Sequence, residues 1–139
     1  MERAAALVIL DGRVLLIERR REAETYYLFP GGRIEPGETR EQALVRELRE
    51  ELGLGVTPSR LVAEVTYNGN VQSYFVTTLV AELPHAFVGD EAADAVWLPV
   101  EGLSGRNVRP AAVARLIEAS PGGWPAEVLR MADKGRHAA

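Results

Sequence analysis

Three glutamates, Glu47, Glu50 and Glu51, stand close together in one segment of the chain. Spacings of three and four residues place their carboxylates on one side of an α-helix, which turns by about 100° per residue. Like charges at these spacings weaken a helix by roughly 0.2–0.5 kcal/mol per pair. The helix dipole also disfavours anions toward the C-terminal end. Stability alone therefore does not favour this arrangement.

A divalent cation would reverse the sign of this repulsion. Hard cations such as Mg²⁺ prefer carboxylate oxygens, retain several waters and bridge phosphate oxygens readily. The cluster therefore predicts a metal site that acts on a polyphosphate. The alternative is an ordinary solvated helix face, on which Arg46 and Arg49 pair with the glutamates as surface salt bridges.

The residues around the cluster extend the pattern over positions 32–54. This stretch resembles the signature of the Nudix hydrolase family, G-x5-E-x7-R-E-U-x-E-E-x-G-U, in which U is a bulky aliphatic residue. Every specified position matches, which is far more specific than a lone glycine motif. The matching residues are Gly32, Glu38, Arg46, Glu47, Leu48, Glu50, Glu51, Gly53 and Leu54.

The resemblance implies a catalytic group made of Glu47, Glu50 and Arg46. Glu50 and Glu51 would be the main ligands of Mg²⁺, with Mn²⁺ as an alternative, and Glu47 would be a further ligand or the general base. Arg46 would orient the catalytic glutamate, because a guanidinium fork holds a carboxylate in one rotamer. For Arg46 alone, the alternative is a surface ion pair.

The resemblance also implies contacts with substrate from Gly32, Arg33, Glu38 and Arg20. Gly32 would allow a backbone conformation near the metal that other residues resist, and Glu38 would act through water or beside the metal ligands. Arg33 and the arginines at 19–21 could bind phosphate, although solvated loop arginines are common. Glu38 could also simply complement the dipole at the start of the helix.

Members of the family often take a further acidic metal ligand from outside the box. Here Glu91 is the candidate, because it lies a few positions before the strand-like segment that contains Trp97. Asp90 and Asp94 are the alternatives. Loop acids are commonly just solvated, and Trp97 itself is expected in the core.

A nucleobase could stack on an aromatic ring near the box. The candidates are Tyr26, Tyr27, Phe29 and Tyr67. Aromatic side chains are mostly core material, so packing is the alternative for each of them.

The resemblance implies that the bond cut is a phosphoanhydride in a nucleoside diphosphate derivative. Small family members with little outside the core favour a nucleoside triphosphate pyrophosphohydrolase. Hydrolysis of ADP-ribose, nucleotide sugars or dinucleoside polyphosphates is the first alternative. A regulatory, non-catalytic domain that binds a nucleotide is the second, although such domains usually lose box glutamates.

Local patterns predict the elements that would position these residues. Thr39 with Gln42 forms a capping-box pattern before a helix over Arg40–Leu52, which Gly53 would end. Strands are expected at Ala5–Leu10, Val14–Arg20, Tyr26–Phe29, Leu61–Tyr67, Ser73–Glu82 and Ala95–Val100, and a second helix at Ala111–Ala119. The polar segment 19–24 is expected to be a loop, and Pro30-Gly31-Gly32 to end a strand.

These elements predict an α/β fold. The resemblance makes it a Nudix-like α/β/α sandwich with a mixed sheet and a loop–helix–loop catalytic motif. One domain is expected over residues 1–139, with the box at 32–54.

Composition limits the other possibilities. The chain has 139 residues, 47% hydrophobic and 26% charged, and no cysteine, which excludes disulfides and thiolate chemistry and is compatible with a cytoplasmic protein. A net charge of −4 argues against stable binding of nucleic acid. No apolar run suggests a membrane segment. The expected partner is a small nucleotide, and a homodimer stays open.

Overall fold

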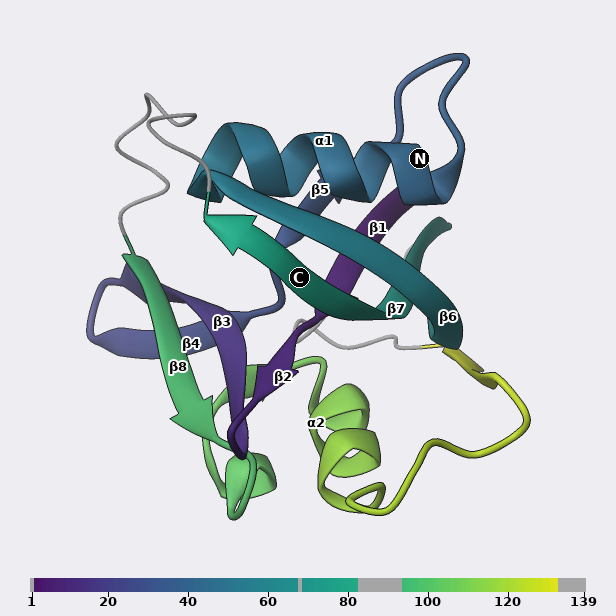
Figure 1. The fold of residues 1–139 in the computed structure, drawn as a ribbon. Helices are drawn as coiled ribbons and strands as arrows, with labels where there is room; N and C mark the ends of the chain where they lie inside the picture. The colour runs from purple at the N-terminus through teal and green to yellow at the C-terminus, as the bar shows by residue number, and fades with distance from the viewer. Residues whose placement is uncertain (1, 68, 83–93, 133–139) are drawn as a thin grey trace.

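The computed structural model describes residues 2–67, 69–82 and 94–132. Its elements follow one another along the chain as Figure 1 shows. They are β1 (Glu2–Leu7), β2 (Ile9–Leu10), β3 (Arg13–Arg21), β4 (Glu24–Leu28), β5 (Gly31–Arg33), α1 (Arg40–Leu52), β6 (Leu54–Tyr67), β7 (Asn70–Glu82), β8 (Ala95–Pro99), η2 (Leu103–Gly105), β9 (Val108–Arg109), α2 (Ala111–Glu118) and β10 (Leu129–Ala132).

The strands form two sheets. The first has the order β10-β6-β7-β1-β5 and is mixed, because β1 runs parallel to β7 and β10 parallel to β6, whereas the β6–β7 and β1–β5 pairs are antiparallel. The second has the order β2-β3-β4-β9, and β8 also pairs with β3.

The two main helices cover opposite faces of the first sheet (Figure 1). Leu44 and Leu48 of α1 are buried in a cluster with Phe75. Ile117 of α2 belongs to a second cluster that includes Tyr74, on the other side of β7. Neighbouring residues of a strand point to opposite faces, so β7 is buried between the helices. The expected α/β/α sandwich with a mixed sheet is therefore confirmed.

Helix α1 begins and ends where local signals predict. The side-chain oxygen of Thr39 accepts a hydrogen bond from the Gln42 backbone at 3.0 Å, and the Gln42 side chain accepts from the Thr39 backbone at 2.9 Å. Gly53 ends the helix in the left-handed conformation, with φ 67°. The predicted second helix is likewise present, as α2.

The first predicted strand is wrong as a single element. Residues 5–7 belong to β1 in the first sheet, whereas Ile9 and Leu10 form β2 and pair with β3 in the second. The chain changes sheets at Val8, which is buried. Residues 5–8 are buried on both faces and so show no alternation. Ile9 and Leu10 after them are also apolar although exposed, so the sequence does not reveal the change.

Strands are also longer and more numerous than predicted. The segment 19–24 is not a loop: β3 continues to Arg21, opposite Glu24 of β4, and the turn places Glu22 at φ 57°. The strand before Pro30 does end, at Leu28, but Gly31 and Gly32 then begin a new strand, β5. In addition, β6 starts as early as Leu54, and β10 was not predicted. Residues 19–21 and Glu24 pair within the β3–β4 hairpin, whereas β5, the start of β6 and β10 pair with strands distant in sequence.

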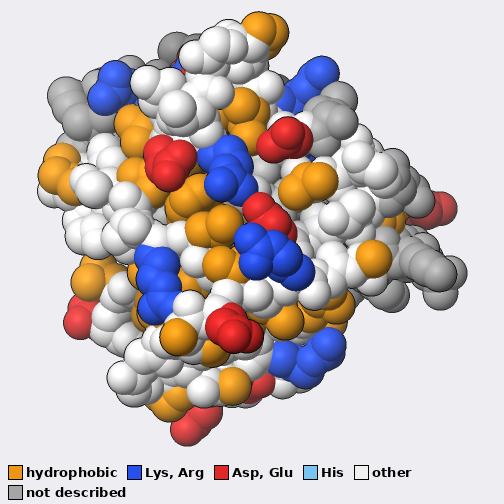
Figure 2. Space-filling model, turned by 90° about the vertical axis from the view of Figure 1, so that its right-hand side faces the viewer, with side chains coloured by type: hydrophobic (Ala, Val, Ile, Leu, Met, Phe, Trp, Pro, Cys, Tyr) orange, Lys and Arg blue, Asp and Glu red, His pale blue; other side chains and the backbone are white. Residues whose placement is uncertain are grey.

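Among the described residues, no helix combines the length and apolar character needed to cross a membrane. Figure 2 shows a face on which basic and acidic side chains alternate among hydrophobic ones. Some of the surface charges pair across elements; Glu64 of β6, for example, contacts Arg40 at 2.8 Å and Arg130 at 3.1 Å. Such pairs contribute little individually.

Candidate functional site

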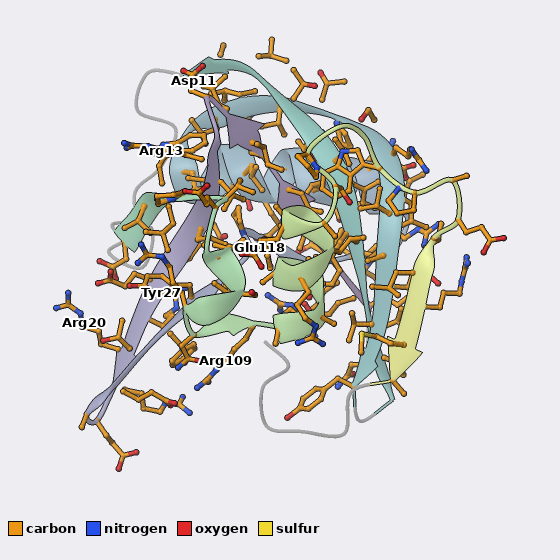
Figure 3. The ribbon with its side chains drawn as sticks, turned by 90° about the horizontal axis from the view of Figure 1, so that it is seen from below. Asp11, Arg13, Arg20, Tyr27, Arg109 and Glu118 are labelled. Carbon is orange, nitrogen blue, oxygen red and sulfur yellow. The ribbon has the colours of Figure 1, made fainter. Side chains whose placement is uncertain are left out.

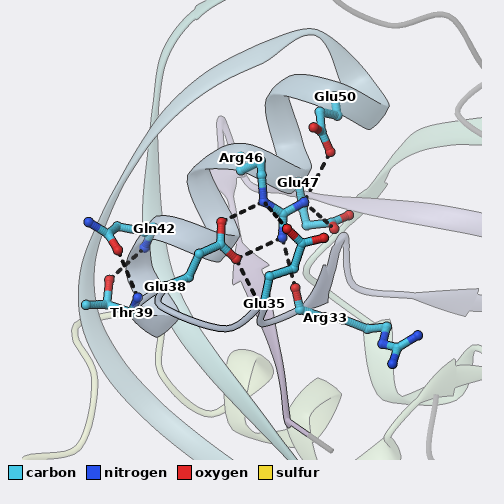
Figure 4. A network of polar contacts seen from close by, with 8 residues as sticks. All are labelled: Arg33, Glu35, Glu38, Thr39, Gln42, Arg46, Glu47 and Glu50. Carbon is cyan, nitrogen blue, oxygen red and sulfur yellow. Dashed lines mark hydrogen bonds and ion pairs between the residues drawn. The ribbon is translucent and has the colours of Figure 1, made fainter.

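Arg46 organises the loop before α1 and the middle of the helix (Figure 4). Its guanidinium donates to both carboxylate oxygens of Glu38, at 2.6 and 3.0 Å, and to the carbonyl oxygen of Arg33 at 3.0 Å. Its Nη1 donates to Glu47 at 2.9 Å and to Glu50 at 3.1 Å. One side chain thus ties β5, the loop and two turns of helix together.

The Arg46–Glu38 pair has the geometry of a strong, charge-assisted contact. The hydrogen bond from Arg46, followed by one from the Glu35 backbone, lowers the pKa of Glu38 to about 2. Glu38 in turn raises the pKa of Arg46 above its usual range. Both groups therefore stay charged at every physiological pH, and Glu38 holds Arg46 in place.

Gly32 lies against the side chain of Glu47. A Cβ atom at position 32 would overlap the Glu47 carboxyl carbon and would lie 2.7 Å from its Cγ. The sequence argument for Gly32 was a special backbone conformation, but Gly32 is not among the glycines with positive φ. The absence of a side chain at Gly32 instead leaves space for the carboxyl group of Glu47.

Glu51 is one helical turn beyond Glu47 and hydrogen-bonds with it. Glu51 is an exposed residue, yet enough protein surrounds its carboxyl group for desolvation to be the largest influence on its pKa. Desolvation, followed by the charge of Glu47 and the hydrogen bond between them, raises the pKa of Glu51 to about 7. Burial and the adjacent carboxylate thus both disfavour the charged form of Glu51.

A divalent cation fits the chemistry of this pair, because it can replace the proton that the raised pKa favours on Glu51 and can compensate both negative charges. The three box glutamates do not converge on one point, however. No group of three or more His, Cys, Asp or Glu side chains in metal-binding position occurs within residues 2–67, 69–82 and 94–132. Glu50, with 61% of its side chain exposed, contacts Arg46 instead.

The arginines named from the sequence occupy different surroundings. Arg20 pairs with Glu18 at 2.8 Å and keeps 76% of its side chain exposed. Arg33 directs its side chain away from the Arg46 network, to which it contributes only its carbonyl oxygen (Figure 4). Arg19 lies within electrostatic range of Glu51, and so does Arg3 of β1, which the sequence analysis missed.

Glu91 and Asp90 lie outside the described residues, and Asp94 is exposed. The described residues on either side of residues 83–93 belong to paired strands. Glu82, at the end of β7, pairs with Leu54 just after α1, and Ala95 pairs with Ile17 of β3. Glu82, the last described residue before that segment, therefore lies beside the C-terminal end of the helix that carries Glu51.

The aromatic candidates fall into two groups. Phe29 is buried and meets the ring of Tyr74 edge to face, with 5.7 Å between centroids. Tyr26 lies under the guanidinium of Arg109 at 4.0 Å. Tyr27 packs at the margin of the core and lies on the same side of the molecule as Arg20 and Arg109 (Figure 3).

Two further aromatic residues were named from the sequence, Tyr67 and Trp97. Tyr67, at the end of β6, is half-buried. Trp97 of β8 packs against the cluster under α1, as expected for a core residue.

Fold and site together define an α/β sandwich protein whose carboxylate-bearing helix covers one face of a mixed sheet and follows its edge strand β5. A family model described as NUDIX domain matches residues 1–118. The chain therefore belongs to the NUDIX family.

Several relatives resemble the chain over part of its length. The CTP pyrophosphohydrolase of Escherichia coli is 46% identical over 65 residues, which cover 45% of this chain and 48% of that protein. The 8-oxo-dGTP diphosphatase of Proteus vulgaris is 49% identical over 68 residues, covering 46% and 61%. The matches thus span about half to three fifths of these relatives.

Solved structures resemble almost the whole chain. The E. coli ORF135 protein superposes with a TM-score of 0.68 and 30% identity, covering 91% of this chain and 94% of that one. A NUDIX hydrolase from Nitrosomonas europaea superposes with a TM-score of 0.71 and 24% identity, covering 90% and 92%. The second likeness bears on the fold alone.

Proposed function

We propose that the protein is a divalent-cation-dependent hydrolase of a phosphoanhydride bond in a nucleotide, with nucleoside triphosphates as the favoured substrates. The observation that carries this proposal is the Glu47–Glu51 pair, two carboxyl groups in hydrogen-bond contact with a raised pKa at Glu51. The complete box and the pyrophosphohydrolase relatives support it.

The Glu47 and Glu51 carboxylates would hold Mg²⁺ or Mn²⁺. Glu50 would join them by turning away from Arg46, and Glu91 would add a ligand from the segment that leaves β7. Mg²⁺ or Mn²⁺ at this position would supply Lewis acidity to phosphate oxygens and lower the pKa of water.

Glu47 is our candidate for the general base. Arg46 fixes one of its oxygens at 2.9 Å, and the open space at Gly32 receives the carboxyl group. A base held in one position from two sides can accept a proton from an attacking water without first reorganising. In this proposal Arg46 is a positioning residue, and Glu38 keeps it charged and in place.

Arg33 and Arg20 are candidates for binding phosphate. Arg33 directly follows Gly32 at the edge strand, and its guanidinium has no ion-pair partner among the described residues. Arg20 would have to leave Glu18. Arg33 is therefore the better placed of the two.

The remaining expectations are also proposals. Residues 1–139 would form one domain that acts on free nucleotides in the cytoplasm, without stable binding of nucleic acid. Size-exclusion chromatography with light scattering would distinguish a monomer from a homodimer.

A hydrolysis screen tests the function. Nucleoside triphosphates, 8-oxo-dGTP, ADP-ribose, a nucleotide sugar and a dinucleoside polyphosphate are each incubated with Mg²⁺ or Mn²⁺, and products are separated by ion-exchange chromatography. We expect nucleoside monophosphate and pyrophosphate from a triphosphate, only when a divalent cation is present. Nucleotide binding without turnover of any compound would favour the regulatory alternative instead.

A further inference from the structure

One cross-strand row of residues runs across the whole first sheet beneath α1. Register places its members side by side on β10, β6, β7, β1 and β5, and they are Arg130, Glu64, Ser73, Ala4 and Gly32. Register partners share one face of a sheet. That face is the one toward α1, because Ala4 belongs to the cluster that includes Leu44 and Leu48 of the helix.

Helix α1 contacts this row at two places. At β5, the Glu47 side chain occupies the space above Gly32. Over β6 and β7, Nη1 of Arg40 donates to the Glu64 carboxylate at 2.8 Å and to the Ser73 hydroxyl oxygen at 3.2 Å. Since Ser73 is 1% exposed, the Arg40 side chain reaches the buried surface of the sheet.

The spacing of the two contacts agrees with the geometry of helix and sheet. Glu47 lies seven positions after Arg40, which is about 10 Å along a helix axis, and the two side chains leave the helix only about 20° apart. Ser73 and Gly32 are two strands apart, which is also about 10 Å. The helix therefore lies along the row and presents Arg40 and Glu47 to it together.

Apolar packing alone does not fix the rotation of α1 about its axis. Leu44 and Leu48 bury area without directional preference, whereas the hydrogen bonds of Arg40 require a particular distance and angle. A group about 6 Å from the helix axis moves by about 1 Å when the helix turns by about 10°. Misplacing a catalytic group by about 1 Å can lower the rate by about 10²-fold.

We infer that Arg40 is a positioning residue. It ties the start of α1 to Glu64 and Ser73, which fixes the rotation of the helix and therefore the position of the Glu47 carboxyl group. Arg46 ties α1 to the loop before it, whereas Arg40 ties it to β6 and β7. For its effect on turnover, the inference rests on the proposed function. Exposed ion pairs contribute little to stability, so the expected role of Arg40 is to give direction.

The contact that Arg40 would control can be measured directly. One Hα of Gly32 points where a Cβ would lie, and a Cβ there would be 2.7 Å from Cγ of Glu47. The NOE between Gly32 Hα and Glu47 Hγ therefore reports the position of Glu47 in the metal-free protein. We expect this NOE to be strong in the wild type.

Arg40→Met removes both hydrogen bonds and keeps an apolar side chain beside the Phe75 ring. We expect the Gly32–Glu47 NOE to weaken. The value of kcat should fall by about tenfold, as for other groups that orient a ligand. The Kd for Mn²⁺, measured by electron paramagnetic resonance, should rise, whereas the KM for the nucleotide should change little.

Two further variants separate positioning from charge. Because both hydrogen bonds come from one nitrogen, a lysine ammonium can make both, so Arg40→Lys should restore the NOE, kcat and the affinity for Mn²⁺. Arg130→Met is the matched control. Arg130 pairs with the same Glu64, at 3.1 Å, but it belongs to β10 and has 64% of its side chain exposed. Its replacement should leave all three measurements at their wild-type values.

The outcomes separate the inference from the proposed function. A folded Arg40→Met protein with a lower melting temperature but an unchanged NOE, kcat and Kd for Mn²⁺ would overturn the inference, since Arg40 would then only stabilise the fold. If Arg40→Met does not fold, Glu64→Gln takes its place, and an unchanged NOE in that variant overturns the inference. A wild type that hydrolyses no nucleotide overturns the proposed function, while the NOE still decides whether Arg40 positions Glu47.

Discussion

The two sides of Arg46 differ in how fully their polar groups are satisfied. Toward the loop, Glu38, the Arg33 carbonyl and the helix cap are all paired within the protein. Toward the C-terminal end of α1, desolvation and the neighbouring charge of Glu47 raise the pKa of Glu51 to about 7. In the first region every polar group named has a partner within the protein. In the second, a bound cation would compensate the charges of the two carboxylates. The contrast distinguishes residues that position from residues that bind.

The largest expected effect is a loss of turnover when a proposed metal ligand near the C-terminal end of α1 is replaced. Glu51→Gln keeps the size of the side chain but removes a proposed metal ligand, so kcat should fall by about 10³-fold. The fold should persist, because the substitution also removes like-charge repulsion. Thermal denaturation and steady-state rates measure the two effects separately.

The matched control is Glu41→Gln, in the exposed first turn of the same helix. It should leave kcat unchanged. Wild-type turnover by a folded Glu51→Gln protein would contradict the ligand role.

Gly32→Ala tests the contact between β5 and the Glu47 side chain of α1. The added methyl group would occupy the space of the Glu47 carboxyl, so Glu47 must move. We expect a loss of about 10²-fold in kcat, since misplacing a catalytic group by about 1 Å has effects of that size. Overpacking should also lower the free energy of unfolding by about 1–3 kcal/mol.

Gly105→Ala is the control for the effect of replacing a glycine by alanine where there is open space. A Cβ there meets nothing within 4 Å, and both stability and activity should stay near wild type. If Gly32→Ala behaved the same way, Glu47 would not depend on this space.

Arg46→Lys weakens the scaffold while keeping its charge. An ammonium group cannot reproduce the two-pronged contact with Glu38, so kcat should drop by roughly 10–100-fold, as for other residues that orient a ligand. The pKa of Glu38, now about 2 because of Arg46, should rise toward 4.5, which NMR titration measures.

The sign of the accompanying pH effect follows from that depressed pKa. Glu38 stabilises the wild-type fold above pH 4.5, and this contribution is lost as pH falls through about 2. In Arg46→Lys the loss should begin at higher pH. An unchanged Glu38 pKa would show that Arg46 does not control this carboxylate.

The smallest effect concerns the affinity for Mg²⁺. Because the pKa of Glu51 is raised to about 7, the metal-free fold gains stability below pH 4.5 that is lost as pH rises through about 7. Mg²⁺ must displace the proton, so its affinity should fall by up to about tenfold from pH 7 to pH 6. Calorimetry in buffers of different ionisation enthalpy should detect close to one proton released at pH 6. An affinity for Mg²⁺ that does not change with pH, with no proton released, would contradict a metal site at a Glu51 carboxyl group of raised pKa.

Local chemistry allowed the sequence to predict α1 almost to the residue, because capping by Thr39 and Gly53 depends on neighbours within the chain. The box glutamates and Arg46 could be named as candidates because their spacing is also a local feature of the chain. The contact between Gly32 and Glu47 could not be foreseen, since it requires β5 to pair with β1 beneath the helix.

Sheet register explains the other omissions. Arg3 is far from the box in sequence, and only the pairing of β1 with β5 places it opposite Arg33. The switch of the first strand between sheets at Val8 is hidden by a run of residues buried on both faces. A single sequence contains no local signal for these long-range pairings.

The central claim is that Glu47 and Glu51 hold the cation on which hydrolysis depends. A crystal of the protein with Mn²⁺ and a non-hydrolysable triphosphate analogue, measured for anomalous scattering, locates that cation directly. The account predicts a manganese peak at about 2.0–2.3 Å from an oxygen of each of the two carboxylates, next to the phosphates. A peak elsewhere, with the Glu47–Glu51 hydrogen bond still in place, would contradict it.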